Sequence, residues 1–258
     1  MIAVVDYQKG NLKSVERGLI AAGGEAFITA DASEIAKADA IVLPGVGAFA
    51  DAAATMCELG QMEVIRERVR AGVPFLGICL GEHLMFEHGV EGAPEGNPAC
   101  GLGLLPGTVV AMPRYDEQGK AFKVPHVGWN TIEMPACNGG AAIPPCGEGG
   151  GQVEPELSSL RSKNAGGAFP DSDPQPGSDL AFACPLFDGI APGEYFYFTH
   201  SYIAPTGSHT IAETTHSVRF TSAVQFGERA FGVQFHPEKS SDAGARVLAN
   251  FVAIAARG

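Results

Sequence analysis

The sequence is poor in basic residues and has no long apolar run. Among its 258 residues, Lys and Arg number 17 against 29 Asp and Glu, so the formal net charge at pH 7 is −12. This balance argues against binding to nucleic acid or to an anionic membrane. No apolar stretch approaches the ~20 residues that span a bilayer, and the first residues lack the basic start and cleavage site of a signal peptide. We therefore expect a cytoplasmic protein.

The sequence also lacks any cysteine pattern that would indicate a metal site or a disulfide framework. None of the six cysteines forms a C-x-x-C pair; they are Cys57, Cys79, Cys100, Cys137, Cys146 and Cys184. We expect no metal and no cofactor, and we interpret five of the six as ordinary thiols.

The order of apolar and helical patterns predicts one α/β domain over residues 1–258. In the first third, short apolar runs at residues 2–5, 26–29 and 40–43 alternate with helical patterns near 11–22, 48–56 and 62–69. Such alternation is typical of a parallel sheet covered on both faces, which binds ligands at the carboxyl ends of its strands. The second half is richer in strand patterns, at 108–112, 123–129, 194–199, 210–215 and 223–226, and ends in a helix near 242–256.

Residues 136–179 depart from this order. They contain nine Gly and six Pro, and Phe169 is their only aromatic residue. A segment of this composition cannot build much core of its own. We expect a mobile surface insertion between two strands, with a short helical turn near 156–160, although a long loop of this kind can also serve as a lid or a partner contact.

The sequence GICLG at residues 77–81 places a cysteine between two glycines, where the apolar strand 73–76 gives way to a helical pattern that we expect to run toward His88. A nucleophile on so tight a turn needs small neighbours, because larger side chains would shield the sulfur. The first NH groups of the helix would stabilise a thiolate and an oxyanion. A lone cysteine is more often an unreactive buried thiol, but this context favours Cys79 as a nucleophile.

A proton carrier for this thiol lies near the carboxyl end, in the sequence FGVQFHPE at residues 231–238. Apolar residues alternate up to His236, which predicts a strand that ends at this imidazole. Glu238 projects to the same side of an extended chain and can fix the tautomer of His236. Alone, His236 would be a capped strand end. Together with Cys79, the pair predicts the base and the orienting carboxylate of an acyl-transfer enzyme.

The combination of GICLG with a distant HPE resembles the class I glutamine amidotransferases, and more narrowly the glutaminase subunits of imidazole glycerol phosphate synthase. The narrower resemblance covers most of the chain outside the insertion. It rests on DYxxGN at 6–11, PGVGAF at 44–49, GLGLLPG at 101–107, PHVGWN at 125–130 and YFTHSY at 197–202. The family implies a three-layer α/β sandwich of flavodoxin-like type, with a central, mostly parallel sheet.

The resemblance implies that the chain hydrolyses glutamine. Cys79 would attack the side-chain amide, His236 would protonate the leaving nitrogen, and water would release glutamate from the thioester. The NH of Leu80 and that of Val46 or Gly47 would bind the oxyanion, after a backbone reorientation that the flanking glycines make easy, although these glycines could also simply form a turn. The substrate contacts implied by the family are Gly45, Gly47, His83, Ser201 and Tyr202.

The resemblance also implies a partner. Ammonia is nucleophilic only while unprotonated, so a shielded route to a second site is expected. In the family that site belongs to a barrel-shaped cyclase subunit, which makes imidazole glycerol phosphate and an aminoimidazole carboxamide ribotide. The contact residues implied for this heterodimer are Asp6, Tyr7, Asn11, His126, Trp129 and Asn130. Trp129 could instead be a core aromatic, but its polar neighbours favour an interface.

The sequence departs from the family pattern beside the nucleophile. Members usually carry Gln two residues after the second glycine of the turn, where this chain has His83, preceded by Glu82 at a position that is usually apolar. His83 offers a donor and an acceptor with shorter reach and a titratable charge, so we expect weaker or pH-dependent capture of glutamine. A plain surface histidine is the alternative.

Three other functions fit the sequence less well. A glutaminase of pyridoxal phosphate or anthranilate synthesis would not explain PHVGWN and DYxxGN. A noncatalytic regulatory subunit with an altered glutamine site would not need Cys79, His236 and Glu238. A papain-like protease would carry its cysteine near the amino end in a different local pattern.

Overall fold

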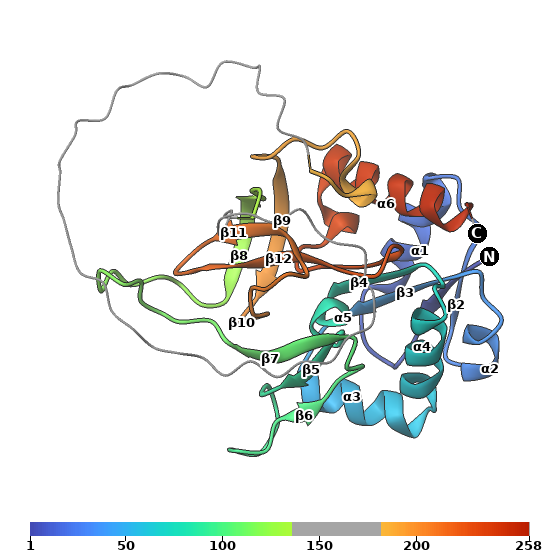
Figure 1. Ribbon diagram of the computed structural model, residues 1–258, viewed down its shortest axis with the longest axis horizontal. Coiled ribbons are helices and arrows are strands. Elements are labelled where there is room, and N and C mark those ends of the chain that lie inside the picture. Colours follow the sequence, from blue (N-terminus) through green and yellow to red (C-terminus); the bar gives the residue numbers. More distant parts are fainter. Residues whose placement is uncertain (136–181, 258) are drawn as a thin grey trace.

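The computed structural model describes residues 1–135 and 182–257 (Figure 1). The predicted insertion, with its expected helical turn near 156–160, lies outside these residues. The centre of the described part is a seven-stranded sheet with the strand order β11-β12-β13-β4-β3-β1-β2. Its parallel strands are β1 (Ile2–Val5), β2 (Ala26–Thr29), β3 (Ala40–Gly45), β4 (Phe75–Cys79) and β13 (Ala230–Val233). Antiparallel strands β12 (Arg219–Phe226) and β11 (Thr210–Thr215) extend one edge.

Helices cover both faces of this sheet, because successive strand residues point to opposite sides. Val42 and Leu76 share a core with residues of α1 (Leu12–Ala21) and α6 (Ser241–Ala255). Their neighbours Ile41 and Phe75 pack on the other face, against α3 and α4. The helices of that second face are α2 (Ala32–Ile35), α3 (Phe49–Glu58) and α4 (Gln61–Arg70). The predicted three-layer α/β architecture is confirmed.

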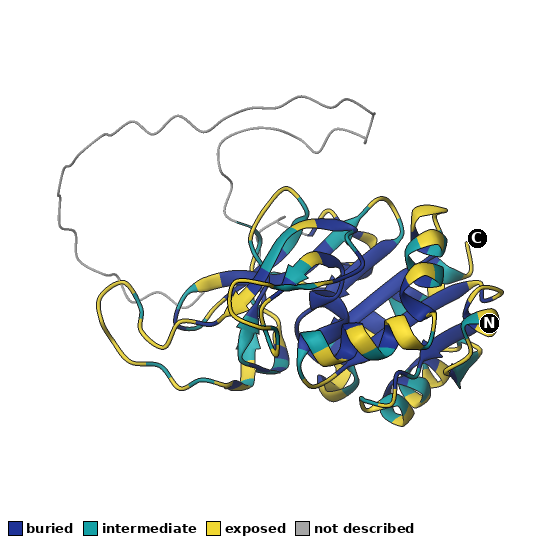
Figure 2. Cartoon of the chain, turned by 90° about the horizontal axis from the view of Figure 1, so that it is seen from below, coloured by how far each residue is buried: buried dark blue, intermediate teal, exposed yellow. Residues whose placement is uncertain are grey.

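The central strands are the most buried part of the fold (Figure 2). Every residue of β1, β3, β4 and β13 is buried, as expected for parallel strands covered on both faces. The longest helix, α6, has 15 residues, and no helix of the described chain is long and apolar enough to cross a membrane.

Two smaller sheets complete the described chain. One has the order β10-β7-β5-β6, and the other pairs β8 with β9. Their strands are β5 (Phe86–Gly89), β6 (Ala99–Cys100), β7 (Leu105–Ala111), β8 (His126–Thr131), β9 (Tyr195–His200) and β10 (Tyr202–Ile203). Short helical turns are α5 (Leu80–His83), η1 (Pro185–Phe187) and η2 (Pro237–Lys239).

The prediction of a long helix from Cys79 toward His88 is wrong. Helix α5 ends at His83, and strand β5 follows. The backbone carbonyls that would continue the helix are taken by the loop that precedes β7: Leu84 O accepts from Leu102 N, and Met85 O accepts from Leu104 N. Tertiary hydrogen bonds therefore outweigh the local helical pattern.

Candidate active site

Three neighbouring strands end at the same edge of the central sheet and bring the candidate residues together. In the ladder between β3 and β4, Gly45 lies opposite Cys79, and in the ladder between β13 and β4, Val233 lies opposite Ile78. Gln234 therefore follows β13 at the level of Cys79, and His236 comes just beyond it. Carboxyl ends of parallel strands are the usual ligand site of such sheets.

Cys79 occupies a strained turn between β4 and α5. Its φ of 55° and ψ of −108° are unusual for a residue with a side chain and cost about 1 to 3 kcal/mol. A Cβ added at Gly81 would lie 1.8 Å from Leu43 O, and one added at Gly77 would lie 2.5 Å from Gly81 O. The two glycines are required because the backbone of α5 passes directly against β3 and β4.

His236 and Glu238 form a buried pair behind the thiol. His236 Nδ1 lies 2.9 Å from Glu238 Oε1, so Nδ1–H donates to the carboxylate and Nε2 is left for the reaction. Nε2 is buried and makes no hydrogen bond within the described chain. Burial opposes the charged imidazole, but Cys79 and Glu238 outweigh it and raise the pKa of His236 to about 9. At neutral pH the imidazole beside the sulfur is therefore protonated.

A cavity of about 350 Å³ opens at Cys79. Its lining includes six residues proposed from the sequence for the oxyanion or the substrate: Val46, Gly47, Leu80, His83, Ser201 and Tyr202. Gly45 does not line the cavity. A Cβ there would lie 2.3 Å from the Tyr7 hydroxyl and 2.8 Å from Leu80 Cβ, so Gly45 serves close packing instead.

The cavity also contains residues that the sequence did not single out. Glu91, Thr199 and His200 line it, and the Thr199 carbonyl oxygen lies 4.0 Å from Cys79 Sγ. Burial, together with the nearby Asp51 carboxylate, raises the pKa of Glu91, although a backbone NH of Phe49 partly opposes this. Glu91 follows β5 in a turn that carries no recognisable motif, so only the fold reveals it.

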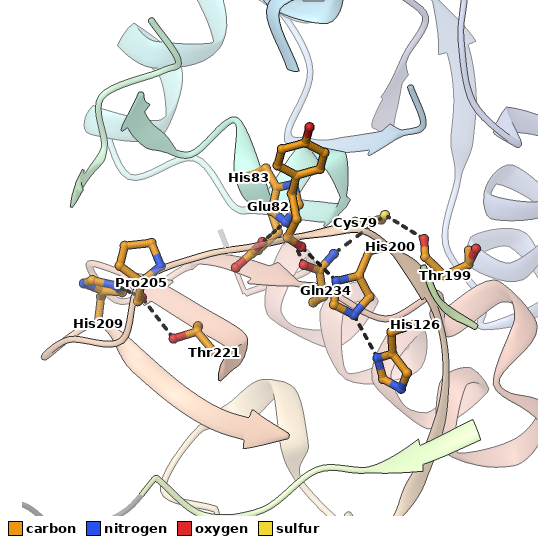
Figure 3. Close-up of polar contacts among 11 residues, drawn as sticks. Cys79, Glu82, His83, His126, Thr199, His200, Pro205, His209, Thr221 and Gln234 are labelled. Atoms are coloured by element: carbon orange, nitrogen blue, oxygen red, sulfur yellow. Dashed lines mark hydrogen bonds and ion pairs between the residues drawn. The ribbon is translucent and has the colours of Figure 1, made fainter. Parts of the chain in front are cut away.

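Glu82, His83 and Gln234 form a buried polar row that ends at the sulfur (Figure 3). His83 Nε2 lies 2.7 Å from Gln234 Oε1 and 3.6 Å from Glu82 Oε2, and Gln234 Nε2 lies 3.7 Å from Cys79 Sγ. Burial lowers the pKa of His83 to about 4 and raises that of Glu82 well above its usual value. His83 is therefore neutral near pH 7, and its charge cannot make glutamine capture pH-dependent there.

Two residues expected at a partner interface are instead internal. Tyr7 is fully buried, and burial together with the nearby Cys79 raises the pKa of its hydroxyl. His126 is 4% exposed and its Nδ1 lies 3.0 Å from His200 Nε2, whose ring donates from Nδ1 to Tyr202 O. The interface expectation is wrong for these two side chains, because neither reaches the surface.

The other proposed interface residues are more accessible. Trp129 is 51% exposed on β8, and Asn11 is exposed at the start of α1. Asp6 and Asn130 are half-buried, and the Asn130 amide donates to Thr215 O at 3.0 Å. Trp129 thus stands out of β8 rather than entering the core.

Comparison with known proteins defines the class. The sequence profile of the family "Glutamine amidotransferase class-I" matches residues 3–141 and 148–255. A crystal structure of a glutamine amidotransferase is 16% identical, with a TM-score of 0.61 over 99% of this chain and 100% of that one. The structure of PurLQS from Thermotoga maritima is 16% identical, with a TM-score of 0.58 over 98% and 97% of the two chains. The chain belongs to the class I glutamine amidotransferases.

Closer relatives define the branch of this class. The imidazole glycerol phosphate synthase subunit HisH of Moorella thermoacetica is 38% identical over 97% of this chain and 93% of its own. That of Rhodopirellula baltica is 37% identical over 97% and 96%. The chain therefore belongs to the family of the imidazole glycerol phosphate synthase subunit HisH, as the resemblance of its motifs predicted.

Replacing Glu82 by Met should raise the free energy of unfolding, and more so at pH 8 than at pH 6.5. The raised pKa means that, above the unfolded value of 4.5, the unfolded chain loses a proton that the folded chain keeps. The wild type therefore loses stability as the pH rises above 4.5, and the Met variant does not share this loss. Met suits the site, since Glu82 Cγ packs with Met85 Sδ and Val224 Cγ2 around Gly232.

Urea unfolding at several pH values measures this difference. The other titrating groups are shared by both proteins, so the difference between them isolates Glu82. The exposed Glu58→Met is the matched control and should follow the wild type. Parallel pH dependences of wild type and Glu82→Met would contradict the assignment of a buried, protonated carboxyl group.

Proposed function

We propose that this chain is the glutaminase subunit of an imidazole glycerol phosphate synthase: it hydrolyses glutamine to glutamate and ammonia, and it delivers the ammonia to a cyclase subunit. The observation that carries the proposal is the strained Cys79 turn beside the His236–Glu238 pair, at the cavity. Membership of the HisH family supports the same reaction. A noncatalytic subunit would have no need for a cysteine in so strained a backbone conformation.

In the proposed reaction, Cys79 Sγ attacks the side-chain carbonyl carbon of glutamine as a thiolate. The charge that develops on the carbonyl oxygen is stabilised by the NH of Leu80 and, after reorientation of its loop, by that of Val46 or Gly47. His236 gives its proton to the leaving nitrogen, and ammonia departs. The neutral imidazole then takes a proton from water as that water cleaves the thioester, which releases glutamate and restores the starting state.

The cavity suits the other end of glutamine as well. Glu91 places a carboxylate in the lining, where it can accept hydrogen bonds from the α-ammonium group. Ser201 and Tyr202 line the same cavity and follow β9, where backbone and hydroxyl groups can bind the α-carboxylate. A substrate with both an ammonium and a carboxylate group is therefore held with its side-chain amide toward Cys79.

The cyclase partner is proposed to bind the outer face of the β8–β9 sheet. Trp129, Val127 and Tyr195 are each more than half exposed there, and Trp129 packs edge-on against Tyr197. Exposed aromatic residues of this kind are typical centres of protein interfaces. Asn11, at the start of α1, is proposed to contribute at the rim.

Cys79→Ala should reduce glutamate release by about a thousandfold or more, since it removes the nucleophile. The assay follows glutamate formation by the chain mixed with a cyclase subunit and its phosphoribulosyl substrate. Cys100→Ala, at an exposed thiol, is the matched control and should remain active. Undiminished turnover by Cys79→Ala would refute the proposed mechanism. If no cyclase subunit stimulates glutamate release by the wild type, the proposed partner would be refuted.

Glu238→Gln should move the alkaline limb of the kcat/KM profile to lower pH. The wild-type limb is expected near pH 9, because His236 must carry a proton to release ammonia and loses it there. Without the carboxylate the pKa of His236 falls toward its ordinary value of 6.5. Rates between pH 6 and 10 test this, with the exposed Glu228→Gln as the control. An unchanged limb would mean that Glu238 does not hold the imidazole protonated.

Trp129→Ala should weaken binding to the cyclase by about tenfold or more, as for an aromatic residue at an interface centre. Isothermal titration of one subunit into the other measures the affinity. Tyr115→Ala removes a similarly exposed aromatic side chain outside strands β8 and β9, at 62% exposure, and should leave affinity unchanged. Equal affinities for wild type and Trp129→Ala would show that Trp129 does not lie at the centre of the interface.

A further inference from the structure

A side chain outside the Cys79–His236–Glu238 triad contacts the nucleophilic sulfur. Gln234 is fully buried, and its Nε2 lies 3.7 Å from Cys79 Sγ, within the range of an N–H···S hydrogen bond (Figure 3). The ladder of β13 on β4 fixes this position, since Val233 lies opposite Ile78. The backbone NH of Gln234 also donates to Ser222 O at 3.0 Å, which ties the residue to β12.

The orientation of the Gln234 amide decides what the sulfur meets. The amide has one donor end and one acceptor end, and the two ends face Cys79 Sγ and His83 Nε2. With Nε2–H on His83, the amide oxygen accepts from the imidazole and the NH₂ group faces the sulfur. The opposite orientation would place a carbonyl oxygen against a thiolate, which is repulsive.

The surroundings of His83 favour the tautomer that donates. Burial keeps this imidazole neutral, so it carries one hydrogen. Its Nε2 lies 2.7 Å from Gln234 Oε1 and 3.6 Å from Glu82 Oε2. Both Glu82 oxygens are buried and make no hydrogen bond within the described chain. A neutral imidazole whose Nε2–H donates to Gln234 Oε1 leaves the amide NH₂ group toward Cys79 Sγ, which is the orientation in the structure.

We propose that Gln234 is a further active-site residue that stabilises the Cys79 thiolate by donating a hydrogen bond to it, and that His83 is a positioning residue that holds the Gln234 amide in the donating orientation. The proposal rests on the proposed function in taking Cys79 as the nucleophile. It gives His83 a role through Gln234 rather than through the substrate alone. Other groups face this row: His236 and Tyr7 the sulfur, Glu82 and His200 the His83 ring.

The rate of alkylation of Cys79 by iodoacetamide tests the proposal, because only the thiolate reacts. The rate is followed from pH 5 to 10 by mass spectrometry of the Cys79 peptide, with the exposed Cys100 peptide of the same sample as an internal reference. Gln234→Met, which has similar length and no donor, should move the midpoint of the profile about one unit upward and lower the rate by about tenfold at pH values below the wild-type midpoint. Gln234→Glu should shift it further, since a carboxylate replaces the donor.

Variants at His83 separate positioning from packing. His83→Gln keeps an N–H donor for Gln234 Oε1 and should stay within about twofold of the wild-type rate. His83→Phe keeps a ring without the donor and should shift the profile in the same direction as Gln234→Met, by a smaller amount. Gln225→Met, on β12 and away from the cavity, is the matched control. Thermal melting checks that each variant is folded.

Profiles of folded Gln234→Met and His83→Phe that coincide with the wild type would overturn the proposal, and so would an equal shift in Gln225→Met. This assay needs neither glutamine nor a cyclase subunit. It therefore reports on Gln234 even if the proposed reaction were wrong, while failure of glutamine turnover with a normal alkylation profile would count against the proposed function alone.

Discussion

The register of three parallel strands is the constraint on which the active site depends. Strands β3, β4 and β13 are hydrogen-bonded side by side, so Gly45, Cys79 and Gln234 form one row at their carboxyl ends. Each strand then supplies one part of the proposed chemistry: β3 leads into the loop proposed for the oxyanion, β4 ends at the proposed nucleophile, and β13 leads into the segment that carries His236. A slip of one residue in either ladder would turn the alternate side chains to the opposite face and separate these groups.

Burial opposes the charged form of both imidazoles of the site, and their neighbours decide the outcome. Burial alone would make both His236 and His83 neutral. His236 has the Glu238 carboxylate and the Cys79 sulfur beside it, which raise its pKa to about 9. His83 has an uncharged amide as its main partner, and its pKa falls to about 4. One imidazole is therefore suited to the proposed role of acid, and the other to the proposed role of neutral hydrogen-bond donor.

Much of the fold and of the candidate site could be predicted from local patterns in the sequence. The glycines around Cys79, the alternation before His236 and the periodicity of α1, α3, α4 and α6 each depend on neighbours in sequence. The end of α5, the cavity position of Glu91 and the contact of Gln234 depend on tertiary pairing, which no local pattern reveals. Tyr7 is a different case: it continues the alternation of β1 on the same side as Val5, in the same core, so its burial could have been read from the sequence.

Strand β9 connects the exposed aromatic face to the catalytic groups. Tyr195 lies on the outer face, and Thr199, near the other end of β9, has its carbonyl 4.0 Å from Cys79 Sγ. Between them, Tyr197 O accepts from His236 N at 2.9 Å, and Ser240 Oγ bridges Tyr197 N and His236 O. The backbone that carries the imidazole is thus bonded to the strand that presents the face for the proposed partner. A displacement of β9 would therefore carry the His236 backbone with it, because these hydrogen bonds join the two directly.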